Sequence, residues 1–584
     1  MPEIRDLLDY RLKMLLGGIF FSLALLLGGL YFFQILHGDK YVRLAYNNRL
    51  RLIRVSAPRG EIFDRHGVPL AVNETTFSIM GYPLDLDTAE KLERVSRVLT
   101  RHGIPATVEG LEKTIRQQRW APYRVIRLAP NLTMPQMAEL VADPDFPREL
   151  FPFPVWRRTY PAGALAANVL GYVGEISEEE LRNSAEGEYS GGDLIGKTGI
   201  ERSYEPELRG AAGEEALEVD ARGRKVRTLD SRSVVKGSDL KLTLDMGVQK
   251  LAVELLAGQK GALVAMDVRT GAVLALASSP TYDNNPLAWG VSGREWRDMT
   301  QDPARPMLDR SIAGIYPPAS TFKALVALAA LEEETITTST SFFCGGALRL
   351  PSRTFRCWRR SGHGTVNVLS ALQYSCDVYF YQAGLKLGID LLLKWCRAFR
   401  LGEPTGIDLP GEASGTIAGP DWKRRRFGEN WYQGDTINYS IGQGYLLLTP
   451  LQIARVYAAI ANGGRLVYPF LCERAYREPT AMPVSRAKLA VVQKGLDYVV
   501  SRGTGARASR FGVTIAGKTG TAQNAHGDDH ALFAGYAPAD DPRYVAVAVV
   551  EAGKHGSSVA SPIVGAVLAH ILSHPDGEGE GQRN

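Results

Sequence analysis

An uncharged apolar run near the N-terminus places the strongest constraint on how this chain folds. Residues 14–36 carry no charged side chain, and leucine, isoleucine and phenylalanine fill most of these 23 positions. A helix needs about 20 such residues to cross the hydrocarbon core of a bilayer. No small-residue cleavage site of the Ala-x-Ala type follows the run, so we expect an uncleaved transmembrane anchor and not a removed signal peptide. Residues 1–13 then form a short tail on one side of the membrane, and the remaining chain folds on the other.

The composition is that of a folded protein with several domains. The chain has 584 residues, and about 100–200 residues per domain predicts three or four units. Its net charge of +5 is small for this length, so we expect no nucleic-acid partner, whereas a basic balance suits an anionic membrane or wall polymer. Basic residues flank the anchor on both sides, so the positive-inside rule does not decide its orientation. Residues 575–584 are polar and glycine-rich, and we expect them not to pack.

A polar segment at residues 231–239 marks a domain boundary near residue 237. Farther on, pairs of small apolar segments predict two antiparallel hairpins, at residues 261–266 with 272–277 and at residues 531–536 with 544–550. The long insert between these hairpins has mostly helical patterns. The C-terminal part therefore predicts an antiparallel sheet covered by helices. No catalytic pattern appears before residue 237.

The first candidate catalytic group is a serine at a predicted helix start. Pro317 and Pro318 interrupt any regular structure, and the following residues 324–331 are apolar on every face, which predicts a helix buried on all sides. Ser320 then lies at the positive end of this helix. Lys323 lies one turn further on the same face, where an amine in a dry site could remove the hydroxyl proton. Serine and lysine at this spacing are common by chance, so the pair needs support from elsewhere.

Two later segments supply what such a serine needs. Ser375-Cys376-Asp377 lies at a break between two predicted helices, and Lys518-Thr519-Gly520-Thr521 follows Ile515 on a predicted strand. A buried cation beside hydroxyls can hold a substrate carboxylate, and strand N–H groups can face an oxyanion. The chain thus reads Ser-x-x-Lys, Ser-x-Asp, Lys-Thr-Gly, the motif order of penicillin-binding proteins and class A β-lactamases.

With these motifs the chain resembles the class B penicillin-binding proteins, and among them the elongation-specific penicillin-binding proteins 2. The resemblance extends over nearly the whole chain and includes the stretches Arg59-Gly60 to Gly67, Tyr160-Pro161 to Gly174, Gly199-Ile200-Glu201, Gly434-Asp435-Thr436, Ser440-Ile441-Gly442-Gln443-Gly444 and Thr449-Pro450-Leu451-Gln452. Two departures stand out. Ala319 replaces the usual glycine, and Asp377 replaces the asparagine of many relatives. An ionised aspartate only accepts hydrogen bonds, so we expect Lys323 or a substrate amide as its partner.

The resemblance implies a complete catalytic cycle. Ser320 attacks the D-Ala-D-Ala carbonyl of a peptidoglycan stem peptide, releases D-alanine and forms an acyl-enzyme that the amine of a neighbouring strand resolves. β-Lactams acylate the same serine. The other implied roles are those of Lys323 as general base, Ser375 and Asp377 in the proton relay, Lys518 with Thr519, Gly520 and Thr521 in binding the terminal carboxylate, and the Ser320 and Thr521 N–H groups as oxyanion hole.

The resemblance also implies an architecture, a location and partners. It divides the chain into a cytoplasmic tail (1–13), a transmembrane helix (14–36), an elongated α+β pedestal for dimerisation or partner contacts (37–236), a transpeptidase domain (237–574) and a disordered tail (575–584). Because the substrate lies outside the cytoplasm, we expect a single-pass inner-membrane protein with a periplasmic catalytic domain. A RodA-like SEDS glycosyltransferase and other elongation proteins are the implied partners.

Three other functions fit parts of the sequence. A D,D-carboxypeptidase uses the same residues with water as acceptor. A non-enzymatic penicillin receptor needs a cytosolic signalling domain, but only 13 residues precede the anchor. Residues 191–198 and 512–519 match the phosphate-loop pattern of an ATPase. No helical pattern follows the second match, as a phosphate loop requires, and the first lies on the side of the membrane where nucleotide is scarce.

Four metal-ligand side chains cluster in the sequence around the middle motif, namely Cys344, Cys357, His363 and Cys376. Three thiolates and an imidazole suit a closed tetrahedral zinc site. The gaps of 12, 5 and 12 residues are longer than in a zinc finger, and a disulfide is the alternative in an oxidising compartment. Cys376 favours the metal, because a zinc ion there could hold Ser375 and Asp377 in position. We therefore predict one structural zinc ion.

Overall fold

The computed structural model describes residues 2–41, 50–117, 125–185, 187–219, 225–351, 353–525 and 527–574. The C-terminal tail predicted at residues 575–584 lies outside the described residues. The chain forms two compact units. Unit 1 comprises Met1–Pro58, Thr75–Trp156 and Gly210–Lys236, and unit 2 comprises Arg59–Glu74, Arg157–Arg209 and Gly237–Asn584. One passage between the units thus falls at the expected position near residue 237, although two earlier segments also pack in unit 2. The domain limits named above remain predictions.

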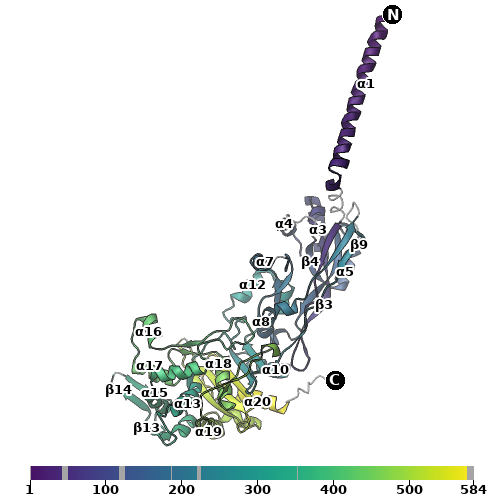
Figure 1. Cartoon of the computed structure of the whole chain (residues 1–584). Helices are drawn as coiled ribbons and strands as arrows, with labels where there is room; N and C mark the ends of the chain where they lie inside the picture. Colours follow the sequence, from purple (N-terminus) through teal and green to yellow (C-terminus); the bar gives the residue numbers. More distant parts are fainter. Residues whose placement is uncertain are drawn as a thin grey trace. The chain divides into compact units, whose positions relative to one another are not determined.

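The N-terminal apolar run forms a single long helix (Figure 1). Helix α1 (Pro2–Tyr31) continues as the π-helical segment η1 (Phe32–Leu36). Its span Leu7–Leu36 has a mean hydropathy of 2.1 and no buried residue, and among the described residues it is the one helix long and apolar enough to cross a membrane. A long apolar helix at the predicted position is confirmed, and helical structure also extends into the predicted tail.

Unit 1 contains a three-stranded sheet and a helical layer. The sheet has the order β1-β8-β9, with β1 (Leu50–Val55), β8 (Gly213–Val219) and β9 (Lys225–Arg232). A second layer contains α3 (Ala89–Arg101), α4 (Val108–Gln117), α5 (Met134–Val141) and β4 (Ile126–Leu132), which pairs with the end of β3 (Pro69–Gly81). Thr88 caps α3 by accepting from the Lys91 N–H. Leu92, Val95 and Leu99 recur at helical spacing and form its buried face.

The centre of unit 2 is a five-stranded antiparallel sheet of order β12-β11-β23-β22-β21. Its strands are β11 (Gly261–Asp267), β12 (Val273–Ser279), β21 (Ala516–Ala522), β22 (His530–Ala537) and β23 (Tyr544–Val550). Alternate residues of a strand point to opposite faces. Val545 and Val547 accordingly belong to one core, whereas Ala546 and Ala548 belong to another. The predicted hairpins and the α+β fold class are confirmed.

Helices cover both faces of this sheet. On one face, α10 (Met246–Leu255) and α20 (Ala560–Ser573) contribute to the core with Ala546. On the other, α13 (Lys323–Glu332) and α18 (Pro450–Ala461) contribute to the core with Val547. The insert between β12 and β21 contains the further helices α11 (Asn285–Trp289), α12 (Gly293–Thr300), α14 (Val368–Gln373), α15 (Asp377–Ala398), α16 (Pro420–Phe427), α17 (Gln433–Ser440) and α19 (Arg486–Arg502). Short strands in the insert are β13 (Ser341–Cys344), β14 (Ala347–Leu350), β15 (Arg353–Arg356) and β16 (Gly364–Asn367).

A buried ion network joins the early segments of unit 2. Glu201, in α8 (Gly199–Ser203), accepts from Arg59 Nη2 at 2.8 Å and from Arg158 Nε at 2.6 Å. Glu205 accepts from the same Arg59 nitrogen at 2.8 Å and from Arg59 Nη1 at 3.3 Å. Glu201 is fully buried, and both arginines are less than 10% exposed. Stretches of sequence more than 140 residues apart therefore meet at one carboxylate.

Candidate active site

Ser320 lies in a tight turn directly before the buried helix α13. The turn is the 3-10 segment η4 (Ala319–Phe322), and α13 begins at Lys323. Ala319 has φ of 49°, in the left-handed region, and its N–H donates to the Gly442 carbonyl at 2.8 Å. A Cβ at Gly442 would lie 2.2 Å from the Ala319 carbonyl oxygen. The backbone of Ser440-Ile441-Gly442 thus packs directly against the backbone of the serine turn. This close approach requires glycine at position 442.

Lys323 connects the first motif to the middle motif. All residues from Lys323 to Leu331 are buried, as predicted for this helix. Lys323 Nζ donates to Asp377 Oδ1 at 2.6 Å and lies 3.0 Å from the Ser375 carbonyl and 3.3 Å from Ser375 Oγ. Lys323 is completely inaccessible, and the Asp377 side chain is 12% exposed. The amine is therefore fixed by three oxygens of the middle motif.

The middle motif occupies the predicted break between α14 and α15. Ser375 has φ of 54°, a strained conformation for a residue with a side chain. Asp377 begins α15, and its Oδ2 accepts from the Trp358 N–H at 2.8 Å. Both carboxylate oxygens of Asp377 are thus acceptors. Sequence reasoning missed Trp358, for which the only signal was its place next to Cys357.

The third motif lies on β21, the end strand of the sheet order. Lys518 is fully buried, and its Nζ lies 3.2 Å from the Thr519 carbonyl and 3.4 Å from Thr519 Oγ1. Burial holds the pKa of Lys518 well below its ordinary value, and the charge of Lys323 lowers it further. Thr519 Oγ1 also lies 3.0 Å from Thr504 Oγ1. Thr504 carried no sequence signal, because it lies in the turn after α19, where no periodic pattern relates it to β21.

The third motif approaches the serine turn closely. A Cβ at Gly520 would lie 3.2 Å from Thr321 Cγ2 and 3.3 Å from the Pro318 carbonyl oxygen. Gln443 Nε2 donates to the Thr521 carbonyl at 3.3 Å, so the segment that holds Ala319 also holds β21. The three motifs therefore surround a single site next to Ser320. An edge strand beside them has backbone groups that can pair with an extended peptide.

Two regions of this chain match known families. Residues 261–569 match the penicillin binding protein transpeptidase domain, and residues 54–242 match the penicillin-binding protein dimerisation domain. The peptidoglycan D,D-transpeptidase MrdA of Haemophilus influenzae is 36% identical over 578 residues, which cover 92% of this chain and 88% of that protein. The chain belongs to the penicillin-binding protein family of D,D-transpeptidases.

Solved structures of penicillin-binding proteins agree with this assignment. The penicillin-binding protein PBP2 of Helicobacter pylori, in its complex with MreC, has a TM-score of 0.81 and 31% identity, covering 90% of this chain and 99% of that one. A chain from a peptidoglycan synthase complex that coordinates polymerization and crosslinking has a TM-score of 0.72 and 31% identity, covering 98% and 100%. The resemblance inferred from the motifs is confirmed.

The phosphate-loop matches of this penicillin-binding protein do not form phosphate sites. Residues 512–519 run into strand β21 and not into a helix. Residues 191–198 precede α8, but a Cβ at Gly199 would lie 2.4 Å from the Gly171 nitrogen, so backbone already fills that helix start.

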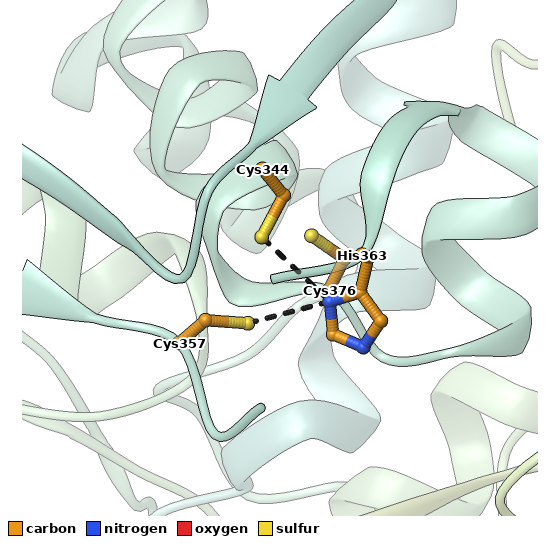
Figure 2. Close-up of side chains that lie close together, drawn as sticks. All are labelled: Cys344, Cys357, His363 and Cys376. Carbon is orange, nitrogen blue, oxygen red and sulfur yellow. Dashed lines mark hydrogen bonds between the residues drawn. The ribbon is translucent and has the colours of Figure 1, made fainter. Parts of the chain in front are cut away.

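The structure brings the four predicted metal ligands together beside the middle motif (Figure 2). Their ligand atoms lie within 4.8 Å of one another, and the three cysteines are buried. His363 Nδ1 lies 3.7 Å from Cys344 Sγ and 3.6 Å from Cys357 Sγ. Every cysteine is free, so the alternative disulfide is not formed. With Zn–S bonds of about 2.3 Å and Zn–N bonds of about 2.1 Å, tetrahedral ligand atoms lie roughly 3.6 Å apart, and the donor set fits a metal ion.

Proposed function

We propose that Ser320 is the nucleophile of a peptidoglycan D,D-transpeptidase that cross-links stem peptides during cell elongation. The observation that carries the proposal is the position of Lys323, which follows the serine by one turn and contacts Ser375 and Asp377. A buried amine beside a serine hydroxyl is a general base for acyl transfer. The relatives named peptidoglycan D,D-transpeptidase MrdA support the reaction.

The residues of the three motifs divide the reaction between them. Lys323 takes the Ser320 proton while the serine Oγ bonds to the D-Ala-D-Ala carbonyl carbon. The proton passes through Ser375 Oγ, 3.3 Å from Lys323 Nζ, to the departing amine as the peptide bond breaks and D-alanine leaves. The acceptor amine then attacks the ester, loses a proton along the same relay, and Ser320 Oγ is protonated again.

Binding and charge stabilisation come from the edge strand. Lys518 with Thr519, Gly520 and Thr521 holds the terminal carboxylate of the donor peptide. The N–H groups of Ser320 and Thr521 face the oxyanion. Loss of one such donor costs about 100–1,000-fold in rate. Asp377 keeps the Lys323 amine in place and serves as an acceptor only.

Covalent labelling with a fluorescent penicillin tests this function. We expect labelling of the full chain that persists for many minutes, because no third carboxylate for deacylation is recognisable. Ser320→Ala should abolish labelling, whereas the exposed Ser339→Ala should retain it. Labelling of Ser320→Ala would contradict the assignment. Products from stem-peptide substrates, cross-linked dimer or shortened monomer, distinguish transpeptidation from hydrolysis.

We also propose that residues 1–13 are cytoplasmic and that the catalytic unit is periplasmic. The anchor helix and the location of the substrate support this orientation. Residues 14 to about 210 then contact a RodA-like SEDS polymerase, which the likeness to a peptidoglycan synthase complex supports, and the likeness to a complex with MreC adds that protein type as a partner. Exchanging this segment for an unrelated anchor should abolish stimulation of glycan polymerisation by the reconstituted pair. Unchanged stimulation would contradict the partner assignment.

We propose further that the Cys/His cluster holds one structural zinc ion through Cys344, Cys357, Cys376 and His363 Nδ1. The donor set leaves no open position for water, so the ion would fix loops and take no part in the reaction. Cys357 adjoins Trp358, whose N–H holds Asp377. Binding would therefore order the support of the Lys323 partner.

Metal and thiol analysis of protein purified without chelator tests the zinc site. We expect about one equivalent of zinc and no oxidised cysteine in the cluster. His363→Ala should lower zinc occupancy and slow acylation of Ser320. Less than about half an equivalent of zinc, or two oxidised cysteines among the four ligands, would contradict the proposal.

A further inference from the structure

Helix α16 and the loop after it carry an exposed surface that combines arginines with aromatic rings. We define it as the α16 surface, comprising Trp422, Arg425, Arg426, Phe427 and Tyr432. Phe427 is 50% and Tyr432 59% exposed, and both arginines are exposed. Neither arginine has an acidic partner among the residues that the structure describes. Neighbouring exposed aromatic rings that form one patch mark binding sites more often than rings exposed singly.

Side-chain contacts fix the conformation of the α16 surface. Lys423 is 3% exposed at its centre, with Nζ 2.7 Å from Asp435 Oδ2 and 4.7 Å from the centre of the Tyr432 ring. The Trp422 ring lies 5.7 Å from Phe427 and 5.4 Å from Tyr445. These contacts neutralise Lys423 internally and fix the aromatic rings. Arg424 lies 3.9 Å from Asp421, so the outward charge without an acidic partner comes from Arg425 and Arg426.

Helix α17 connects this surface to the serine turn. It begins at Gln433, next to Tyr432, and ends at Ser440, after which Gly442 accepts from the Ala319 N–H. Its 8 residues span about 12 Å. The start of α17 also packs on the strand that leads to Trp358, because a Cβ at Gly434 would lie 3.1 Å from the Phe355 ring. Figure 1 shows α16 and α17 at one margin of unit 2.

We propose that the α16 surface binds the saccharide and acidic peptide of an uncross-linked peptidoglycan strand while its stem peptide occupies Ser320. This inference rests on the proposed function. Four extended residues span about 13 Å, which is comparable with the length of α17 between this surface and the segment that supports the serine turn. Arginine forks match carboxylates, and aromatic faces cover the apolar faces of sugars. A glycan strand that carries both carboxylates and sugars fits the surface better than a ligand with charge alone.

Binding of soluble uncross-linked glycan strands by the detergent-solubilised full chain tests the inference. Each variant is made with Ser320→Ala for binding, so that strands are not consumed, and with Ser320 intact for penicillin labelling. Arg425→Gln with Arg426→Gln should weaken strand binding about five- to tenfold and reduce its salt dependence. Phe427→Ala with Tyr432→Ala should weaken binding similarly but retain the salt dependence. Labelling rates should stay within about twofold in both variants.

Arg507→Gln with Arg510→Gln is the matched control, since it removes the same charge from other exposed arginines. Unchanged strand binding in both test variants, or an equal loss in the control, would overturn the inference. Loss of binding to vesicles of anionic lipid, with strand binding intact, would assign the surface to a membrane and overturn it too. Failure of the parent chain to bind strands would contradict this inference but leave the proposed function intact. Failure of the parent chain to react with penicillin would remove the proposed function.

Discussion

Replacing Glu201 by glutamine removes the charge at the centre of the buried network in unit 2. The carboxylate accepts from Arg59 at 2.8 Å and Arg158 at 2.6 Å and is fully buried. Glutamine keeps the shape of the side chain but leaves Arg158 without its counter-charge and Arg59 with Glu205 alone, and it turns an NH₂ group toward one of the guanidinium groups. Breaking a buried pair in this way costs about 3–5 kcal/mol. We therefore expect a marked loss of stability and no change in the residues that contact substrate.

Thermal unfolding of the full chain measures the loss. A cost of about 3–5 kcal/mol corresponds to a fall in Tm of about 3–6 °C for a unit of this size. Glu188→Gln is the control, because its pair with Arg209 is about 30% exposed at each side chain and is worth less than about 1 kcal/mol. A Tm for Glu201→Gln within about 1 °C of the parent would refute the reasoning.

The pH dependence gives a second measurement of the same network. Burial opposes ionisation of Glu201, but Arg158 and Arg59 outweigh it and lower the pKa of its carboxyl below the ordinary value of about 4.5. The unfolded chain therefore binds this proton more readily than the folded chain. The stabilisation is complete above about pH 4.5 and is lost as the pH falls below it. The parent should lose this contribution on acidification, and Glu201→Gln should not.

Three further substitutions test the serine site. Lys518→Met should raise Tm at pH 7 by about 2–4 °C, while penicillin labelling falls at least about tenfold. Because burial lowers the pKa of Lys518, the stability of the parent rises with pH up to the ordinary lysine pKa of 10.5. Unfolding curves from pH 7 to 10 should show that the variant lacks this rise. Gly442→Ala places a Cβ 2.2 Å from the Ala319 oxygen at φ of 73°, so we expect a cost of about 1–3 kcal/mol and slower acylation in a penicillin kinetic assay; parent-like kinetics would contradict the support of the turn. The Tyr316 hydroxyl donates to Glu551 at 2.8 Å and so holds the segment before Ser320 in place. Glu551→Gln weakens this acceptor. It should lower the acylation rate constant about three- to tenfold, with little change in the penicillin concentration at half-maximal rate.

Local patterns predicted those parts of the fold that are built from one stretch of sequence. The apolar run after Lys323 specified a helix that is buried on every side, and small apolar segments such as residues 544–550 specified central strands. The motif order indicated that Ser320, Lys518 and Asp377 belong to one site. Such features depend on periodicity and residue type, which are visible without tertiary structure.

The remaining features depend on contacts that no local pattern encodes. The Trp358 N–H contacts Asp377, and the Thr504 and Thr519 hydroxyls contact each other, only because segments outside the motifs fold back onto them. The positive φ values of Ala319 and Ser375 are likewise imposed by their neighbours, since alanine and serine have no preference for that region. The four metal ligands were identified by type, but their closeness depends on the antiparallel pairs β13–β16 and β14–β15 and on the start of α15.

The order of strands in the central sheet determines when the catalytic site can form during folding. Strand β11 pairs directly with β23, from Gly261 opposite Val550 to Asp267 opposite Tyr544. The whole helical insert, with Ser320 and the middle motif, is made between these two partners. Until residues 544–550 are available, α13 lacks one side of its core and β11 has an open edge. A chain that stops before β23 therefore contains all three serine-site motifs but cannot assemble them. Its unpaired strand β11 would make it prone to aggregation and proteolysis.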